Sequence, residues 1–267
     1  MLELKNLYKT FNPGTINEKL ALNGLSLTLK EGDFVTVIGG NGAGKSTMLN
    51  AVAGTWMVDE GQILIDGTDV TRLSEHKRAA YLGRVFQDPM TGTAATMGIE
   101  ENLALAKRRG KTRFLRPGIT RKERDEYREL LKVLGLGLED RLTSKVGLLS
   151  GGQRQALTLL MATLKKPKLL LLDEHTAALD PKTAAKVLEI TDMIVNRDHL
   201  TTMMITHNMQ SALDLGNRIL MMDSGDIVLD IHEEEKKGLT VEGLLEKFKT
   251  GAGKMLDNDR ILLSGEK

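Results

Sequence analysis

The sequence contains no cysteine among its 267 residues. Without thiols the chain has no disulfides, no thiolate nucleophile and no cysteine metal ligand, a composition that suits a reducing compartment. An excess of charge of one sign is also lacking, because 37 Lys and Arg residues face 36 Asp and Glu residues and the formal net charge is +1. No overall electrostatic field therefore directs the protein to nucleic acid or anionic lipid, and its ligand has to be recognised locally.

Long hydrophobic runs are absent too. No apolar stretch approaches the roughly 20 residues that cross a bilayer, and residues 1–5 (MLELK) do not begin a secretory signal. We therefore expect a soluble protein whose role at a membrane, if it has one, depends on a partner. With 41% hydrophobic residues the chain can still build the core of one large domain or two small ones.

The most informative feature is a glycine-rich string that follows the apolar run 34–38 and precedes a helix-like segment. Residues 39–47 read GGNGAGKST. In the pattern G-x-x-x-x-G-K-[ST], glycines let backbone N–H groups curl around a phosphate at a helix N-terminus. We expect Lys45 to reach the β- and γ-phosphates, Ser46 to bind Mg²⁺ and Thr47 to lie near the α-phosphate. The predicted phosphate loop consists of Gly39, Gly40, Asn41, Gly42, Ala43, Gly44, Lys45, Ser46 and Thr47.

Hydrophobic periodicity predicts an α/β fold. Alternating leucines in residues 2–29 have the period of antiparallel strands. Residues 88–166 are helical and charged, and a capping box at Thr120 and Glu123 opens an amphipathic helix there. Strands then alternate with helices over residues 169–206, which is the order that produces a parallel sheet.

Three further segments complete the predicted secondary structure. A strand at 61–67 is followed by a short helix that Ser74 caps, strands return over 218–229, and a last helix spans 241–248. The string GAGK at 251–254 copies part of the phosphate loop, but Met255 follows it and no strand precedes it, so we interpret it as part of a mobile tail.

These segments predict one domain over residues 1–248. A nucleotide-binding core would combine residues 1–87 and 167–230, a helical subdomain would span 88–166, and residues 249–267 would form a flexible tail.

A pair of carboxylates follows the most apolar predicted strand. Residues 169–174 read LLLLDE, which places Asp173 and Glu174 at a strand end, where α/β sheets carry their ligand chemistry. Asp173 can hold Mg²⁺, and Glu174 can orient and polarise an attacking water. Taken alone, the pair could equally be two solvated acids in a turn. The phosphate loop in the same chain favours the catalytic interpretation.

The string LSGGQ at residues 149–153 narrows the class of phosphate-loop protein. On this string and the phosphate loop, the chain resembles the ATP-binding cassette (ABC) family over about residues 2–248. The resemblance implies an α/β phosphate-loop NTPase fold with a parallel core sheet, an antiparallel β-subdomain and a helical insertion. It also implies that Ser150, Gly151, Gly152 and Gln153 contact the γ-phosphate of ATP held by a second copy, so that the working unit is a dimer.

Other positions match the family one at a time. Gln87 resembles the glutamine that joins the core to the helical insertion and touches the metal or the attacking water. Asp180 resembles a residue that crosses the dimer interface, and His207 resembles a switch histidine that contacts the γ-phosphate. Phe11 is similar to the aromatic residue that stacks on adenine, with Tyr8 as the second candidate and packing at a strand edge as the alternative role.

Two features are not explained by the resemblance. His175 stands where most of the family have proline or a small residue; it either tunes Glu174 or is a tolerated neighbour that points away. The second feature is a basic run, which has three interpretations: a solvated face of the helical insertion, a surface near lipid headgroups, or a surface that binds nucleic acid. The third is the least favoured, because few aromatic residues lie among the basic ones. The run comprises Lys107, Arg108, Arg109, Lys111, Arg113, Arg116, Arg121, Lys122 and Arg124.

The function implied by the resemblance is ATP hydrolysis that drives transport through separate permease subunits. Each permease would dock a short cytoplasmic helix in a groove beside Gln87, which places the protein at the cytoplasmic face of the membrane. The string DEHTAALD at 173–180 looks like that of bacterial importers of amino acids or similar nutrients, which use an extracytoplasmic solute-binding protein. We expect no nucleic-acid partner. The alternatives are a soluble ABC ATPase, for example in iron–sulfur assembly, and a phosphate-loop kinase.

Overall fold

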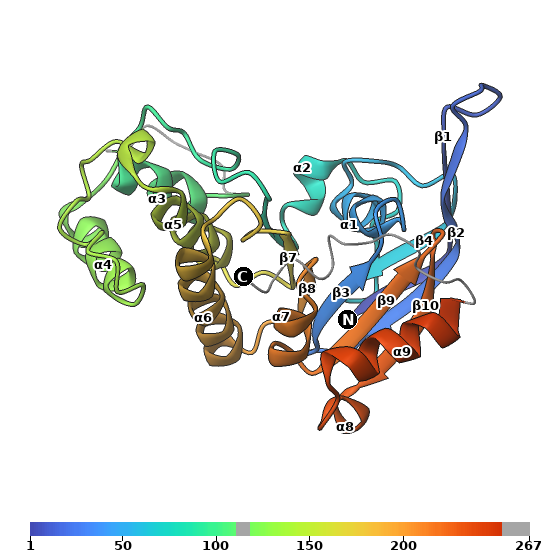
Figure 1. The fold of residues 1–267 in the computed structure, drawn as a ribbon. Coiled ribbons are helices and arrows are strands. Elements are labelled where there is room, and N and C mark those ends of the chain that lie inside the picture. Colours follow the sequence, from blue (N-terminus) through green and yellow to red (C-terminus); the bar gives the residue numbers. More distant parts are fainter. Residues whose placement is uncertain (111–117, 253–267) are drawn as a thin grey trace.

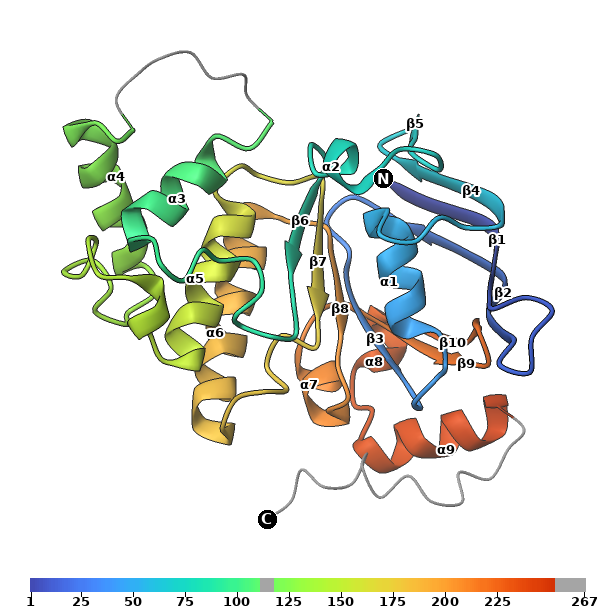
Figure 2. The ribbon, with the colours of Figure 1, turned by 90° about the horizontal axis from the view of Figure 1, so that it is seen from above.

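The structure is a computed structural model that describes residues 1–110 and 118–252. Two β-sheets lie beside a group of helices (Figures 1 and 2). The smaller sheet is antiparallel with the strand order β2-β1-β4-β5, which confirms the predicted antiparallel region. Its strands are β1 (Leu2–Phe11), β2 (Lys19–Leu29), β4 (Glu60–Ile65) and β5 (Thr68–Asp69).

The larger sheet has six strands in the order β10-β9-β3-β8-β7-β6. All of its neighbouring strands are parallel except β10, which pairs antiparallel with β9 and so confirms a predominantly parallel core sheet. These strands are β3 (Phe34–Gly39), β6 (Leu82–Val85), β7 (Leu169–Asp173), β8 (Thr202–Ile205), β9 (Arg218–Asp223) and β10 (Asp226–His232). Strand β6 was not predicted from the sequence.

Helices cover the faces of this sheet. Helices α3 to α6 form a layer on one side, and α1 follows β3 on the side of the smaller sheet (Figure 2). The helices are α1 (Lys45–Ala53), α2 (Glu75–Arg78), α3 (Ile99–Lys107), α4 (Arg121–Lys132), α5 (Gly151–Thr163), α6 (Pro181–Asp198), α7 (Met209–Asp214), α8 (Glu233–Lys236) and α9 (Val241–Ala252).

Strand β7 shows why its sequence is apolar throughout. Leu169 and Leu171 pack in the core around α1, whereas Leu170 and Leu172 pack in the core under α5 and α6. Successive residues of a strand point to opposite faces, so a strand covered on both faces needs no polar position. The strand therefore becomes polar only where it leaves the cores, at Asp173.

Local signals for helix ends gave one correct and one incorrect prediction. The capping box is confirmed, because the Thr120 hydroxyl accepts from the Glu123 N–H and the Glu123 carboxylate accepts from the Thr120 N–H. Ser74 does precede α2, but its hydroxyl makes no capping bond and lies 3.0 Å from Nδ1 of His76. The prediction of a side-chain cap at Ser74 was wrong because the neighbouring imidazole competes for the hydroxyl.

The end of the described chain also differs from expectation. Helix α9 continues to Ala252, past the predicted end at Phe248, and the rest of the predicted tail lies outside the described residues. Within residues 1–110 and 118–252, no helix combines the length and the apolar character that crossing a bilayer requires.

Candidate active site

The glycine-rich string forms a tight loop between β3 and α1. Gly39 and Gly44 have φ angles of 149° and 99°, which favour glycine. A Cβ atom on Gly39 would lie 2.2 Å from the carbonyl oxygen of Met222, and one on Gly44 would lie 2.6 Å from that of Ala21. The chain therefore approaches other backbone at both positions, and only glycine fits there. The loop ends at the N-terminus of α1, where free backbone N–H groups favour an anion.

Lys45 is folded back on this loop. Its Nζ donates to the carbonyl oxygens of Gly39 at 2.7 Å and Gly40 at 2.9 Å, and the residue is 5% exposed. The two carbonyl contacts hold the ammonium beside the loop that we predict to bind phosphates.

A cavity of about 240 Å³ opens over the loop. It brings together residues of β1, β2, the loop and α1 with the residues that follow β7 and β8. Its lining consists of Phe11, Lys19, Ala21, Asn41, Gly42, Ala43, Gly44, Lys45, Ser46, Thr47, Glu174 and His207. Most of these were predicted from the sequence. Lys19 and Ala21 were not, because no motif marks them and only the pairing of β2 with β1 brings them to the cavity.

The structure distinguishes the two aromatic candidates. Phe11 lines the cavity and makes an edge-to-face contact with Trp56, with ring centroids 4.9 Å apart. Tyr8 does not line the cavity; it is 38% exposed, and its hydroxyl lies next to Gly24. The geometry therefore favours Phe11 as the side chain that meets a ligand.

Glu174 and His207 meet at the ends of β7 and β8. The Oε1 atom of Glu174 lies 2.5 Å from Nε2 of His207, and their side chains are 11% and 32% exposed. Glu174 has a φ angle of 45°, which is uncommon outside glycine, and its N–H donates to the carbonyl of Ile205 at 3.1 Å. This turn out of β7 directs the carboxylate toward the cavity, so the structure places the predicted base and the predicted sensor side by side.

Asp173 ends β7 and does not line the cavity. Burial raises the pKa of its carboxyl above the usual value, while the guanidinium of Arg84, 3.8 Å away, opposes that shift. Arg84 also donates to Asn50 at 2.6 Å and to Thr55 at 2.9 Å on and after α1. Arg84 therefore joins the end of β7 to the helix that starts at the phosphate loop.

The predicted metal ligands have the chemistry of a Mg²⁺ site. Ser46 offers a hydroxyl at the start of α1 and Asp173 a carboxylate at the end of β7, and Mg²⁺ prefers such oxygen ligands. Within the described part of the chain, no three His, Asp or Glu side chains group closely enough to hold a metal by themselves.

The residues of the LSGGQ string lie away from this cavity. Ser150 caps α5 in a capping box with Gln153, and Ser150 and Gly151 are exposed. Gly152 is buried instead, and a Cβ atom on it would lie 2.0 Å from Cγ2 of Thr183 on α6. One glycine of the string thus permits close packing of α5 on α6.

Asp180 and Gln87 also lie outside the cavity lining. Asp180 caps α6, where its carboxylate accepts from the N–H of Thr183 at 3.1 Å. Hydrogen bonds from the Thr183 side chain and from this N–H lower the pKa of Asp180. Gln87 is exposed just after β6. Both residues, like Ser150, are exposed on the surface of this chain.

His175 points away from the cavity. It is 2% exposed, its Nε2 lies 3.0 Å from the Thr191 hydroxyl on α6, and burial lowers its pKa to about 4. The Thr191 hydroxyl donates its proton to the Val187 carbonyl at 2.8 Å, so the Nε2 of His175 carries the proton in their contact. The geometry supports the interpretation that His175 is a packed neighbour of Glu174.

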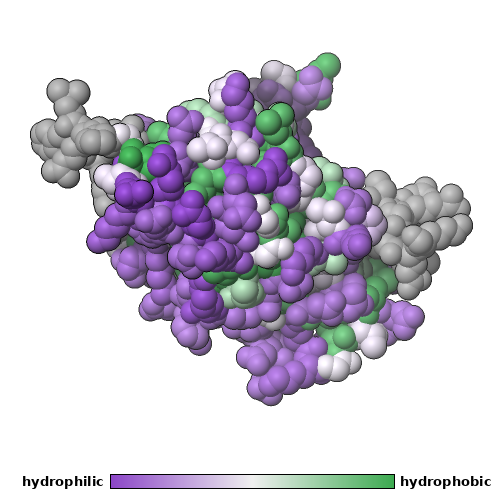
Figure 3. Space-filling model, turned by 90° about the vertical axis from the view of Figure 1, so that its left-hand side faces the viewer, coloured by the Kyte–Doolittle hydropathy of each residue, from purple (hydrophilic) through white to green (hydrophobic). Residues whose placement is uncertain are grey.

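Three of the six described residues of the basic run form ion pairs with acids. Lys107 pairs with Glu126, Arg108 with Glu123 and Arg124 with Glu100, at distances of 2.5 to 3.1 Å. Lys111, Arg113 and Arg116 lie outside the described residues. The face that carries these helices is mostly hydrophilic (Figure 3). These observations support a solvated face of the helical layer.

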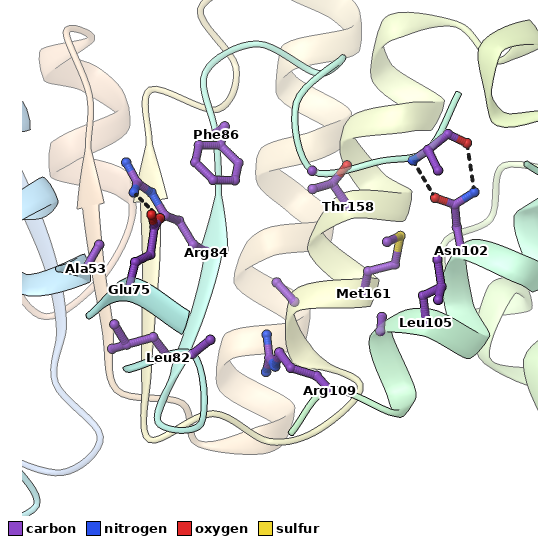
Figure 4. A pocket seen from close by; sticks show the side chains of 15 residues that line it. Ala53, Glu75, Leu82, Arg84, Phe86, Asn102, Leu105, Arg109, Thr158 and Met161 are labelled. Carbon is purple, nitrogen blue, oxygen red and sulfur yellow. Dashed lines mark hydrogen bonds and ion pairs between the residues drawn. The ribbon is translucent and has the colours of Figure 1, made fainter. Parts of the chain in front are cut away.

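A second hollow, of about 430 Å³, lies between the core and the helical layer (Figure 4). Arg84 and Glu75 face each other at 3.5 Å on one side, and Arg84 lies 4.5 Å from the centre of the Phe86 ring. On the other side, Asn102 bonds to the backbone of Ala94. The lining consists of Ala53, Glu75, Ala79, Leu82, Arg84, Phe86, Gly92, Ala94, Asn102, Leu105, Ala106, Arg109, Thr158, Met161 and Ala162. We call this hollow the helical groove.

Known sequences resemble this chain over most of its length. The profile described as ABC transporter matches residues 22–177. A tyrosine transport ATP-binding protein of Clostridioides difficile (strain R20291) is 47% identical over 253 residues, which cover 93% of this chain and 98% of that protein. A methionine import ATP-binding protein of Rhizobium johnstonii is 37% identical over 212 residues, and the match covers 78% of this chain but only 56% of that protein.

A solved structure agrees with these sequences. A dimeric ATP-binding cassette in a post-hydrolysis state, bound to ADP and Pi, matches with a TM-score of 0.74 and 31% identity. The match covers 87% of this chain and 99% of that one. The family profile spans more than half of the chain, and the tyrosine transport relative matches it nearly end to end. The chain therefore belongs to the ABC transporter family, among its ATP-binding proteins.

Proposed function

We propose that this protein is the ATP-hydrolysing subunit of an importer that takes up a small nutrient such as an amino acid. The observation that carries the proposal is the meeting of Glu174 and His207 at a cavity over the phosphate loop. Support for transport comes from relatives whose names describe tyrosine transport and methionine import. In this proposal ATP is hydrolysed to drive transport, and the transported solute is a different molecule.

The arrangement of side chains gives each a role in hydrolysis. The N–H groups of the loop and Lys45 bind the phosphates, and Lys45 exchanges its carbonyl contacts for them. Glu174 orients the attacking water and accepts its proton, while His207 holds that carboxylate and contacts the γ-phosphate. Ser46, Asp173 and Gln87 would hold Mg²⁺, which neutralises charge on the phosphates when it is bound.

A second copy of the chain completes each site in this proposal. Ser150, Gly151, Gln153 and Asp180 lie outside the cavity of their own chain, and Ser150 and Asp180 are exposed at the N-termini of α5 and α6. A helix N-terminus favours an anion, so α5 of one copy can cover the γ-phosphate held by the other. The dimeric state of the solved relative supports this arrangement.

The helical groove is the proposed docking site of the permease. It is lined mainly by apolar side chains from the core and from α3 and α5, and it lies next to Phe86, which precedes Gln87. A short amphipathic helix from a cytoplasmic loop of a permease would fill such a groove. Docking there would place the protein at the cytoplasmic face of the membrane, in a system that also has an extracytoplasmic solute-binding protein.

The proposed domain organisation follows the same division. Residues 1–87 and 167–230 would be the nucleotide-binding core, and residues 88–166 the helical subdomain that carries the groove. A soluble ATPase role in iron–sulfur assembly is not favoured, because relatives that are 47% and 37% identical to this chain bear transport names.

Affinity purification of the tagged protein from detergent-solubilised membranes tests the proposal. We expect polytopic membrane proteins to copurify with the wild type and to raise its ATPase activity. Met161→Glu places a charge in the groove and should abolish the complex, whereas Met193→Glu, the same change at an exposed site on α6, should keep it. Circular dichroism would show that both variants fold. Recovery of the wild type with soluble proteins alone would overturn the transport role.

A further inference from the structure

Lys19 stands directly opposite Phe11 in the pairing of β1 with β2. Directly opposite residues of an antiparallel pair have their Cβ atoms about 5 Å apart on the same face. Both side chains also line the cavity over the phosphate loop. The β1–β2 hairpin therefore presents a lysine and an aromatic ring to the same cavity.

The ammonium of Lys19 lies against the phosphate loop. A Cβ atom on Gly42 would be 2.9 Å from Nζ of Lys19. Among the residues that the structure describes, neither a hydrogen bond nor an ion pair engages this side chain. By contrast, Lys45 bonds to loop carbonyls and Glu174 contacts His207. Lys19 thus brings to the cavity a positive charge that no group in residues 1–110 and 118–252 neutralises.

We propose that Lys19 binds the phosphate chain of the nucleotide, in addition to the phosphate loop and Lys45. This inference rests on the proposed function, because the ligand of the cavity is taken to be ATP. An ammonium is a compact point charge with three donors, which suits phosphate oxygens. The contact comes from the hairpin that also carries Phe11, so β1 and β2 would hold the base and the phosphates of the same molecule.

The contact acts on binding and not on the chemical step. Lys19 lies beside Gly42, while the proposed base Glu174 reaches the cavity from the end of β7. A charge that attracts the phosphates equally in substrate and transition state lowers KM and leaves kcat unchanged. Loss of a charge-assisted hydrogen bond corresponds to about a tenfold change in affinity.

The test compares Lys19→Met with Lys19→Arg and a matched control, Lys30→Met, at the exposed residue after β2. Calorimetry would measure binding of ATP, inorganic tripolyphosphate and adenosine to each full-length variant. We expect Lys19→Met to weaken the binding of ATP and of tripolyphosphate about tenfold and to leave the binding of adenosine unchanged. Lys19→Arg should restore binding, and KM should rise in Lys19→Met at constant kcat.

Three results would overturn the inference. ATP affinity in Lys19→Met could equal that of the wild type, or Lys30→Met could lose as much affinity as Lys19→Met. Lys19→Met could weaken adenosine binding as much as ATP binding, which would mean that Lys19 acts by holding Phe11 in place and not by contacting the phosphates. A wild-type protein that binds no ATP would instead contradict the proposed function itself, so the two failures are distinguishable.

Discussion

Glu174 Oε1 and His207 Nε2 lie 2.5 Å apart, although 33 positions separate them in the sequence. Neighbouring strands bring them together, because Asp173 of β7 pairs with Ile205 of β8 and each side chain follows within two residues of that pair. The Glu174 N–H also donates to the Ile205 carbonyl. The backbone therefore fixes the pair at the edge of the cavity before any ligand binds.

Replacing Glu174 by Gln should remove turnover and keep nucleotide binding. The amide keeps the shape of the side chain and can still contact His207, but it cannot accept a proton from water. General-base catalysis contributes roughly 100-fold to 10,000-fold, so kcat should fall by at least about 100-fold. ATP would then persist, and size-exclusion chromatography with ATP should show a dimer.

The matched control for this variant is Glu189→Gln. Glu189 is exposed on α6 and pairs with Lys186 of the same helix. The Glu189→Gln protein should keep wild-type turnover and remain monomeric under conditions in which Glu174→Gln forms a stable dimer. Turnover at the wild-type rate in Glu174→Gln would remove Glu174 from its proposed role.

Replacing Phe11 by Ala should weaken ATP binding, whereas Tyr8→Ala should not. Phe11 lines the cavity and Tyr8 does not. Loss of a stacking ring is worth about 1–3 kcal/mol, which corresponds to a change in Kd of about 5-fold to 150-fold. Trp56, the single tryptophan of the chain, contacts Phe11, so its fluorescence on titration with ATP measures both variants. Equal affinities would mean that Phe11 only packs at the strand edge.

Much of this site could be predicted because its parts are encoded by contiguous strings. The phosphate loop needs glycines at backbone positions that other residues cannot adopt, so Gly39 and Gly44 identify it without knowledge of the fold. Asp173 and Glu174 were identified because a continuously apolar strand is covered on both faces, so the first acidic residues after it mark the end of the strand. The contact of Glu174 with His207 was not predicted; it results from the parallel pairing of β7 with β8 in the structure.

The sequence did not reveal what depends on pairing or packing between distant segments. Lys19 reaches the cavity only because β2 pairs with Phe11 in one register. Gly152 was interpreted only as a nucleotide contact, but the structure shows that it also lets α5 approach Thr183. The direction in which His175 points could not be chosen from the sequence, because either face of a turn was open to it.

The free energy of unfolding should fall less on acidification in His175→Gln than in the wild type. The folded state holds this histidine neutral until about pH 4, whereas the unfolded chain takes up a proton near 6.5. Between these values the unfolded state binds more protons, so stability falls as pH falls. The wild type should therefore lose roughly 2 kcal/mol more than His175→Gln between pH 7.5 and 5.

Urea denaturation at the two pH values measures this difference. The readout is the change in stability with pH and not its absolute value, so any general effect of the substitution cancels. The pH dependence of ATPase activity, measured where both proteins are folded, should be the same in the two. A shifted activity profile in His175→Gln would support the alternative that His175 tunes Glu174.

Replacing Gly152 by Ala should destabilise the protein through its contact with Thr183. The added Cβ would lie 2.0 Å from Cγ2, and Thr183 is β-branched and stiff on the first turn of α6. Such overpacking costs about 1–3 kcal/mol, although Ala is otherwise better than Gly in a helix by about 1 kcal/mol.

The test repeats Gly152→Ala in a protein that already carries Thr183→Ser. Serine lacks Cγ2 but keeps the backbone N–H that donates to the Asp180 carboxylate. In that background Gly152→Ala should be neutral or stabilising, and the double-mutant cycle should show a coupling above about 1 kcal/mol. Purely additive effects on the free energy of unfolding would mean that Gly152 is not required for packing of α5 on α6. If ATPase activity is lost even where stability is restored, the glycine also serves the nucleotide of the partner copy.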